Sequence, residues 1–185
     1  MSKLVERHEI IDYQTYETQR SAMRRRIMEI KRPRRIHLGD VLTFLFENRD
    51  TVRYQIQEMM RAEQIVKESA IQHEIETYNE LLGGDGELGC ALLIEIDDPV
   101  ERVRKLEQWK SLPGHIYTRL DDGTTVRPGF DPRQVGERRL SAVQYLKFAT
   151  GGRVPVALGC DLPGLELETE LTEEQRRALA EDLGR

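Results

Sequence analysis

The sequence predicts an α+β fold: a helical amino-terminal half packs on a mainly antiparallel sheet, with one or two further helices in the second half. Apolar residues recur at helical spacing through residues 1–82 and alternate with polar residues along much of residues 83–185. A glycine-rich turn at residues 83–86 marks the change of period. The length of 185 residues indicates a single domain, residues 1–185, with a mainly helical part followed by a strand-rich part.

Three helices are expected in the first part. Residues 13–31 place apolar side chains near helical spacing, and Pro33 ends this helix because proline lacks a backbone donor and restricts the residue before it. Residues 48–82 are the most helical stretch, and Asn48 is a suitable cap for its start. A break near residues 65–69 divides this stretch into two helices.

Residues 40–47 leave two interpretations open. Gly39 and Asp40 lie between two apolar runs, which is typical of the tight turn of a hairpin and would make this segment a strand. A helix that begins at Asp40 competes with it, because periodicity does not discriminate over so short a run. The choice determines where the side chain of Glu47 points.

The second part is expected to contain short strands and two helices. Asp98-Pro99 begins one helix, which continues to about Lys110, and the capping box at residues 172–175 begins another. Asp122-Gly123 is a hairpin signal between two of the strands. The strands are expected at residues 88–96, 115–120, 124–127, 139–148 and 154–158.

Composition excludes several classes of protein. A membrane helix needs about 20 largely apolar residues, and the longest apolar run, residues 90–94, is far shorter. The amino terminus carries no apolar signal-peptide core. The two cysteines, Cys90 and Cys160, lie in strand-like apolar contexts, so we expect buried free thiols, a reducing compartment and a cytoplasmic location.

A basic cluster occupies residues 20–35, which hold eight cations and one acid, Glu29. Such a cluster could bind nucleic acid or another anion by releasing counterions. However, no aromatic residue lies inside the run for base stacking, so a third hypothesis is weak nucleic-acid binding through residues 20–35. We expect the arginines to pair with the acidic second part or to contact an anion or a partner, with these candidates: Arg24, Arg25, Arg34 and Arg35.

A candidate ligand site follows the apolar run 42–46. Glu47, Asn48 and Arg49 stand at the junction of an apolar element and a helix, where free backbone donors and an arginine could converge on a carboxylate. With Tyr54 and Glu58 facing them, they would form an enzyme site for a small anionic substrate. The same residues are equally typical of a helix cap with local ion pairs.

No motif for a metal, nucleotide or nucleophile accompanies this site. The four histidines are widely separated, and His73-Glu74 lacks a second histidine at the zinc-protease spacing. The glycines of residues 83–86 lack the Lys-Ser/Thr of a phosphate loop. We therefore predict no metal site and no cofactor, and leave open whether the protein is an enzyme.

Several stretches resemble the bacterial family catalogued as domain of unknown function 3501. They are residues 34–39, 42–52, 54–59, 74–82 and 141–146. The resemblance spans about residues 16–183 and carries no catalytic residues. It implies an association with rubrerythrin-type and iron–sulfur redox proteins. Because this chain lacks the clustered cysteines of an iron–sulfur centre, we predict a non-catalytic binding or accessory protein that acts through a partner, and a homodimer with Met23, Met59 and Met60 at interfaces or in the core.

Overall fold

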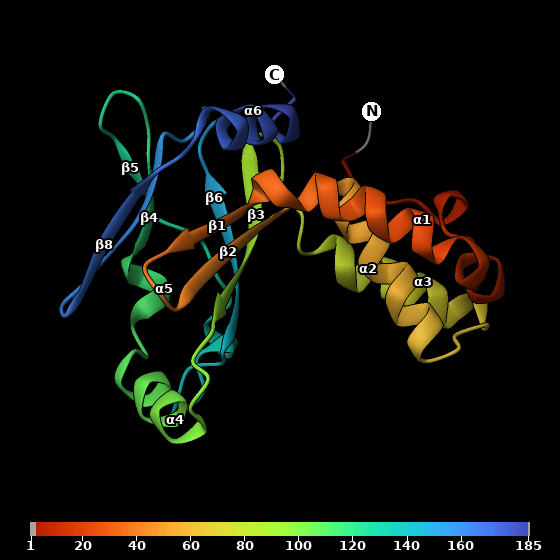
Figure 1. The fold of residues 1–185 in the computed structure, drawn as a ribbon, viewed down its shortest axis with the longest axis horizontal. Coiled ribbons are helices and arrows are strands. Elements are labelled where there is room, and N and C mark those ends of the chain that lie inside the picture. The colour runs from red at the N-terminus through yellow and green to blue at the C-terminus, as the bar shows by residue number, and fades with distance from the viewer. Residues whose placement is uncertain (1–2, 185) are drawn as a thin grey trace.

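The computed structural model describes residues 3–184, which form six α-helices and eight strands in two lobes (Figure 1). The predicted α+β class is confirmed. The strands form two four-stranded antiparallel sheets, rather than the single sheet expected from the sequence. The helices are α1 (Tyr13–Lys31), α2 (Arg49–Ala62), α3 (Glu68–Asn79), α4 (Pro99–Gln108), α5 (Leu112–His115) and α6 (Glu173–Asp182).

The first sheet, sheet A, contains the segment that the sequence left ambiguous. Its order is β1-β2-β3-β6, and its strands are β1 (Arg35–Leu38), β2 (Leu42–Glu47), β3 (Glu87–Ile94) and β6 (Val143–Ala149). Phe44 of β2 lies opposite Ile36 on one side and Leu92 on the other, so both neighbours hold this segment as a central strand. Gly39 has φ +63° in the turn between β1 and β2, a conformation that favours glycine.

The second sheet, sheet B, has the order β5-β4-β7-β8. Its strands are β4 (Ile116–Arg119), β5 (Thr125–Val126), β7 (Ala157–Leu162) and β8 (Leu165–Glu170). Residues 154–158 were predicted as the strand, but β7 begins only at Ala157, two residues after Pro155, which has no donor for the ladder. Strand β8 is an addition to the prediction, and so is the short helix α5, which begins at Leu112.

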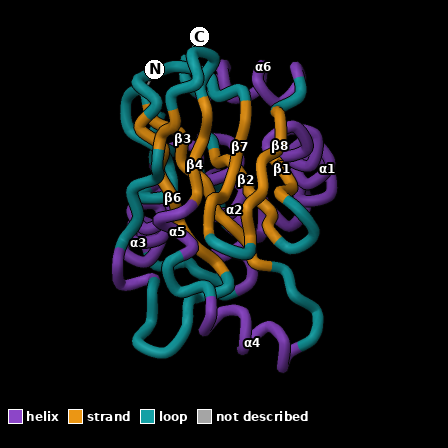
Figure 2. The backbone as a smooth tube through the Cα atoms, turned by 90° about the vertical axis from the view of Figure 1, so that its left-hand side faces the viewer, coloured by secondary structure: helices purple, strands orange, loops and turns teal. Residues whose placement is uncertain are grey.

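The main core lies between the two sheets. Side chains of both sheets form one buried cluster, in which the rings of Phe46 and Phe148 lie 6.1 Å apart. Helix α6 lies across one end of the strands and α4 beyond the other end (Figures 1 and 2). Leu179 of α6 and Leu106 of α4 both belong to the cluster, so these helices close the ends of the core.

Helices α1, α2 and α3 form the second lobe and pack mainly on one another. Ile56 and Met60 of α2 are buried against Ile71 and Ile75 of α3, so Met60 belongs to this core. Asn48 caps α2 through a reciprocal pair of hydrogen bonds with Thr51. Short connections join α1 to β1, β2 to α2 and α3 to β3, so three adjacent strands of sheet A hold the helices beside it.

Within residues 3–184, no helix is long and apolar enough to cross a membrane. Both cysteines are free and buried, as expected: Cys90 lies on β3 and Cys160 on β7, and each belongs to the main core. Burial raises the pKa of both thiols. Neither cysteine has the character of a reactive thiol.

Candidate functional site

Glu47 ends β2 with its side chain in the interior, where it is only 5% exposed. Its carboxylate accepts hydrogen bonds from the hydroxyl of Thr51 and, at 3.1 Å, from the amide of Gln55. Burial raises the pKa of Glu47, although the hydrogen bond from Thr51 and the charge of Lys31 act in the opposite direction. The strand thus turns the carboxylate of Glu47, whose direction the sequence left open, into the interior.

Asn48 and Arg49 follow Glu47 into the first turn of α2. The side-chain oxygen of Asn48 accepts from the backbone of Thr51 at 3.0 Å, and its amide donates to Asp182 of α6 at 3.1 Å. The guanidinium of Arg49 binds Glu9 at 2.7 Å. Both side chains therefore already serve the cap and ion-pair roles that the sequence left as an alternative.

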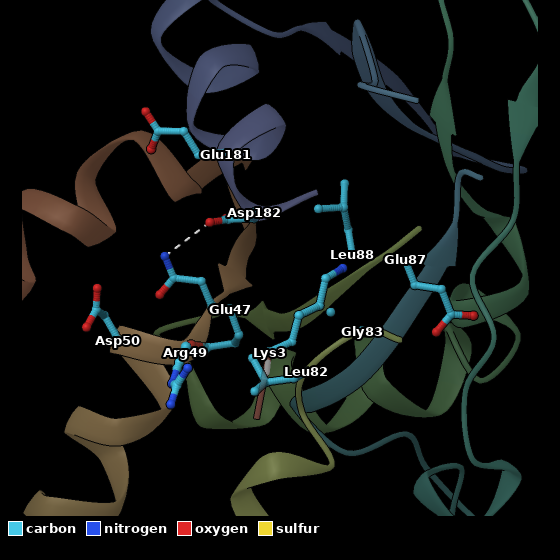
Figure 3. A pocket seen from close by; sticks show the side chains of 12 residues that line it. Lys3, Glu47, Arg49, Asp50, Leu82, Gly83, Glu87, Leu88, Glu181 and Asp182 are labelled. Atoms are coloured by element: carbon cyan, nitrogen blue, oxygen red, sulfur yellow. Dashed lines mark hydrogen bonds between the residues drawn. The ribbon is translucent and has the colours of Figure 1, made fainter. Parts of the chain in front are cut away.

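A cavity of about 260 Å³ lies beside these residues, between the ends of α2, β3 and α6 (Figure 3). Carboxylates outnumber cations in its lining, which does not favour the small anionic substrate expected from the sequence. The cations are Lys3 and Arg49, and the carboxylates are Glu47, Asp50, Glu87, Glu181 and Asp182.

Tyr54 and Glu58 do not join this cavity. Tyr54 is 8% exposed and packs with Tyr16 and Ile27 between α1 and α2. Glu58 accepts from Tyr16 at 2.5 Å and from Arg20 at 2.8 Å and 2.9 Å. These bonds, chiefly the one from Arg20, lower the pKa of Glu58 to about 2. Tyr54 and Glu58, both predicted as part of the ligand site, therefore join α1 to α2.

The basic cluster divides into buried and exposed members. Arg34, predicted to contact an anion or a partner, is 5% exposed, and its guanidinium makes two bonds of 2.8 Å to Asp182. It ties the end of α1 to α6 and is not accessible to a partner. Arg24, Arg25 and Arg35 are exposed and make no ion pair with any residue between 3 and 184.

A second hollow, which sequence reasoning missed, also borders the segment that joins α3 to β3. This groove of about 720 Å³ is lined by the end of α3, residues 129–134 and β6. Its apolar and aromatic walls come from Tyr78, Leu81, Phe130, Tyr145 and Ala149, its carboxylates from Glu80, Glu87 and Asp131, and its cation from Lys147. Its volume lies within the range of about 300–1,000 Å³ usual for ligand sites.

The outer face of sheet A continues this groove. Val143 and Tyr145 of β6 point outward and are 36% and 46% exposed, whereas Gln144 between them is completely buried. The usual alternation is inverted only at this point of β6, because Leu146 and Phe148 face the core and Lys147 faces outward. Gln134 blocks the free edge of β6 here, because its side-chain amide donates to the Tyr145 carbonyl at 3.1 Å.

No three histidine, cysteine, aspartate or glutamate side chains lie together so that they could hold a metal ion, as far as the described part of the chain extends. His115 of α5 is paired with Asp161 of β7 at 2.9 Å, on the outer face of sheet B. Arg127 binds the same carboxylate. This histidine therefore belongs to a network of surface ion pairs.

Comparisons with known proteins give a family but no activity. No curated protein matches the chain. A crystal structure of a novel protein of unknown function from Burkholderia pseudomallei is similar to it, with 27% sequence identity and a TM-score of 0.88, over 97% of this chain and 98% of that one. The family model described as protein of unknown function (DUF3501) matches residues 4–183. The resemblance predicted from the sequence is thus confirmed, and the chain belongs to the DUF3501 family.

Proposed function

We propose that this protein is a non-catalytic binding or accessory protein, which acts through a protein partner bound in the groove between α3 and β6. The observation that carries this proposal is the exposure of Tyr145 and Val143 where the groove meets the outer face of sheet A. Contiguous apolar surface of this kind is typical of contact sites. Tyrosine is also enriched at protein interfaces.

The family resemblance points to the class of partner. It implies an association with rubrerythrin-type and iron–sulfur redox proteins, for which this chain would serve as an accessory. Both cysteines are buried in the main core, which supports a role in binding such a protein over a direct role in thiol exchange.

Isothermal titration calorimetry with a purified rubrerythrin-type protein from the same genome tests the proposal. We expect binding by the wild type and at least tenfold weaker binding by Tyr145→Glu, because a carboxylate would enter an apolar contact. Val100→Glu is the matched control, since Val100 is 78% exposed on α4, outside the groove. Equal binding by the wild type and Tyr145→Glu would contradict the proposal.

An enzyme is the second candidate, and the buried Glu47 at the cavity favours it. A carboxyl group with a raised pKa in a hollow is a frequent feature of catalytic sites. Native mass spectrometry of the purified protein, followed by the same sample denatured, separates the two candidates. A co-purified small molecule that is lost in Glu47→Gln would support the enzyme, and a partner protein lost in Tyr145→Glu would support the accessory role.

A further inference from the structure

Four of the eight cations in the basic cluster are engaged within the chain. The one acid of the cluster, Glu29, belongs to these contacts, because it binds Arg32 at 3.3 Å. No unpaired acid therefore remains within residues 20–35 for the other four cations. The engaged cations and their partners are Arg20 with Glu58, Lys31 with the ring of Tyr54, Arg32 with Glu29 and Glu174, and Arg34 with Asp182.

Three of the remaining cations, Arg24, Arg25 and Arg26, are consecutive on α1, and all three are exposed. None of them makes an ion pair with any residue from 3 to 184. Arg26 lines a small hollow together with Asp50, but that carboxylate binds Arg53 at 2.9 Å. Helix α1 therefore carries positive charge that the rest of the described chain does not neutralise.

An exposed apolar side chain, Met28, stands next to these arginines on α1. Residues three and four positions apart are neighbours on a helix surface, so Met28 lies beside both Arg24 and Arg25. Its side chain is 43% exposed, whereas Met23 and Ile27 pack in the cluster between α1 and α2. The outward face of α1, formed by Arg24, Arg25 and Met28, thus combines an apolar side chain with two cations.

The composition of this face favours a protein partner over a nucleic acid. Arginine and methionine are enriched at protein interfaces, whereas lysine is depleted there, and the exposed cations at residues 24–26 are all arginines. The planar guanidinium group of arginine binds a carboxylate through two parallel hydrogen bonds. A nucleic acid would find no aromatic ring for base stacking in residues 17–31. The face therefore suits a protein segment that presents carboxylates and an apolar side chain.

We propose that the outward face of α1 binds an acidic segment of a partner protein, in which two carboxylates meet Arg24 and Arg25 and an apolar side chain contacts Met28. No residue that lines the groove between α3 and β6 belongs to α1, so this surface is separate from the groove. The inference therefore goes beyond the proposed function, and either of the two can fail without the other.

Fluorescence anisotropy with labelled peptides tests the inference on the full chain. The probe is a short peptide of glutamate, alanine and leucine residues, and two reference peptides replace either its glutamates by glutamine or its leucines by alanine. We expect the wild type to bind the probe about tenfold more tightly than the glutamine peptide. Added salt should weaken binding of the probe, because it screens charges at the surface.

Variants of the face separate its charge from its apolar contact. The double variant Arg24→Gln, Arg25→Gln should bind the probe no better than the wild type binds the glutamine peptide. The matched control is Arg138→Gln, Arg139→Gln, at two adjacent exposed arginines that have no ion pair in the described part of the chain, and it should leave binding unchanged. Met28→Gln should weaken binding of the probe severalfold and leave binding of the alanine peptide unchanged.

Three results would overturn the inference. The first is equal binding of the probe and the glutamine peptide by the wild type, and the second is an equal effect of the two double variants. The third is tighter binding of a single-stranded DNA oligonucleotide, or of phosphatidylglycerol vesicles, that is lost in Arg24→Gln, Arg25→Gln. The face would then serve a nucleic acid or a membrane surface instead of a protein.

Discussion

The cavity at Glu47 and the groove at Tyr145 both border the segment between α3 and β3, and Glu87 lines both. In the cavity most charged groups already have partners: Asp182 binds Arg34, and Arg49 binds Glu9. In the groove, Tyr145 is 46% exposed, and neither Glu80 nor Lys147 makes a salt bridge with any residue from 3 to 184. Most of the polar residues that look functional in the sequence therefore join helices to one another or, through Asn48 and Arg34, to α6, while the surface available in the groove lies along β6.

The largest expected effect concerns the buried ion pair beside the cavity. Asp182→Ala leaves the guanidinium of Arg34 buried without its main counter-charge, so we expect a loss of about 3–5 kcal/mol in the free energy of unfolding. Urea denaturation measures this loss. Glu181→Ala is the control, because this side chain is 65% exposed and 3.6 Å from Arg34; it should cost at most about 0.5 kcal/mol.

Glu58→Gln tests whether a predicted site residue is instead a structural one. It removes a carboxylate bound by Arg20, so we expect a loss of about 2 kcal/mol in the free energy of unfolding at pH 7. The pKa of Glu58 is lowered from 4.5 to about 2, so its stabilisation is present above pH 4.5 and lost as the pH falls towards 2. Urea unfolding at several pH values should therefore show wild type and variant converging in acid. A constant difference would contradict this account, and the exposed Glu63→Gln is the control.

Glu47→Gln should raise the free energy of unfolding at pH 7, whereas Glu58→Gln should lower it. Because burial raises the pKa of Glu47, the folded protein binds the proton more tightly than the unfolded chain, and stability falls as pH rises through the interval between the two pKa values. The neutral variant should therefore be more stable than the wild type at pH 7, by less than the change at Glu58. This gain should shrink as the pH falls to the usual range of a carboxyl group. Unfolding curves at pH 5 and pH 7 measure it, and a loss of stability at pH 7 would contradict it.

The sequence predicted features that depend on neighbours in the chain. The caps at Asn48 and Thr172 are such local features, and both were placed correctly. Residues 47–49 are consecutive, so the sequence likewise predicted that they lie close together. Residues 40–47 remained ambiguous because the strand depends on pairing with β1 and β3, and β3 lies more than 40 residues away.

The rest could not be predicted because it depends on contacts between distant residues. Arg34 and Asp182 are 148 positions apart, so nothing near Arg34 indicated that α6 would cover it. Tyr54 and Glu58 were expected to face Glu47, but α1 packs on their side of α2 and binds them through Tyr16 and Arg20. The groove needs α3 beside β6, a proximity that no local pattern encodes.

The smallest expected change in stability is at Val143, on the outer face of β6 beside the groove. Val143→Thr keeps a β-branched side chain in β6 and replaces a methyl group that is already exposed to solvent, so the free energy of unfolding should stay within about 0.5 kcal/mol of the wild type. Partner binding in calorimetry should nevertheless weaken severalfold, because a hydroxyl group would be desolvated in the contact. Val66→Thr, at a site 74% exposed between α2 and α3, should change neither quantity. Unchanged binding by Val143→Thr would confine the contact to the groove and exclude this part of the outer face of sheet A.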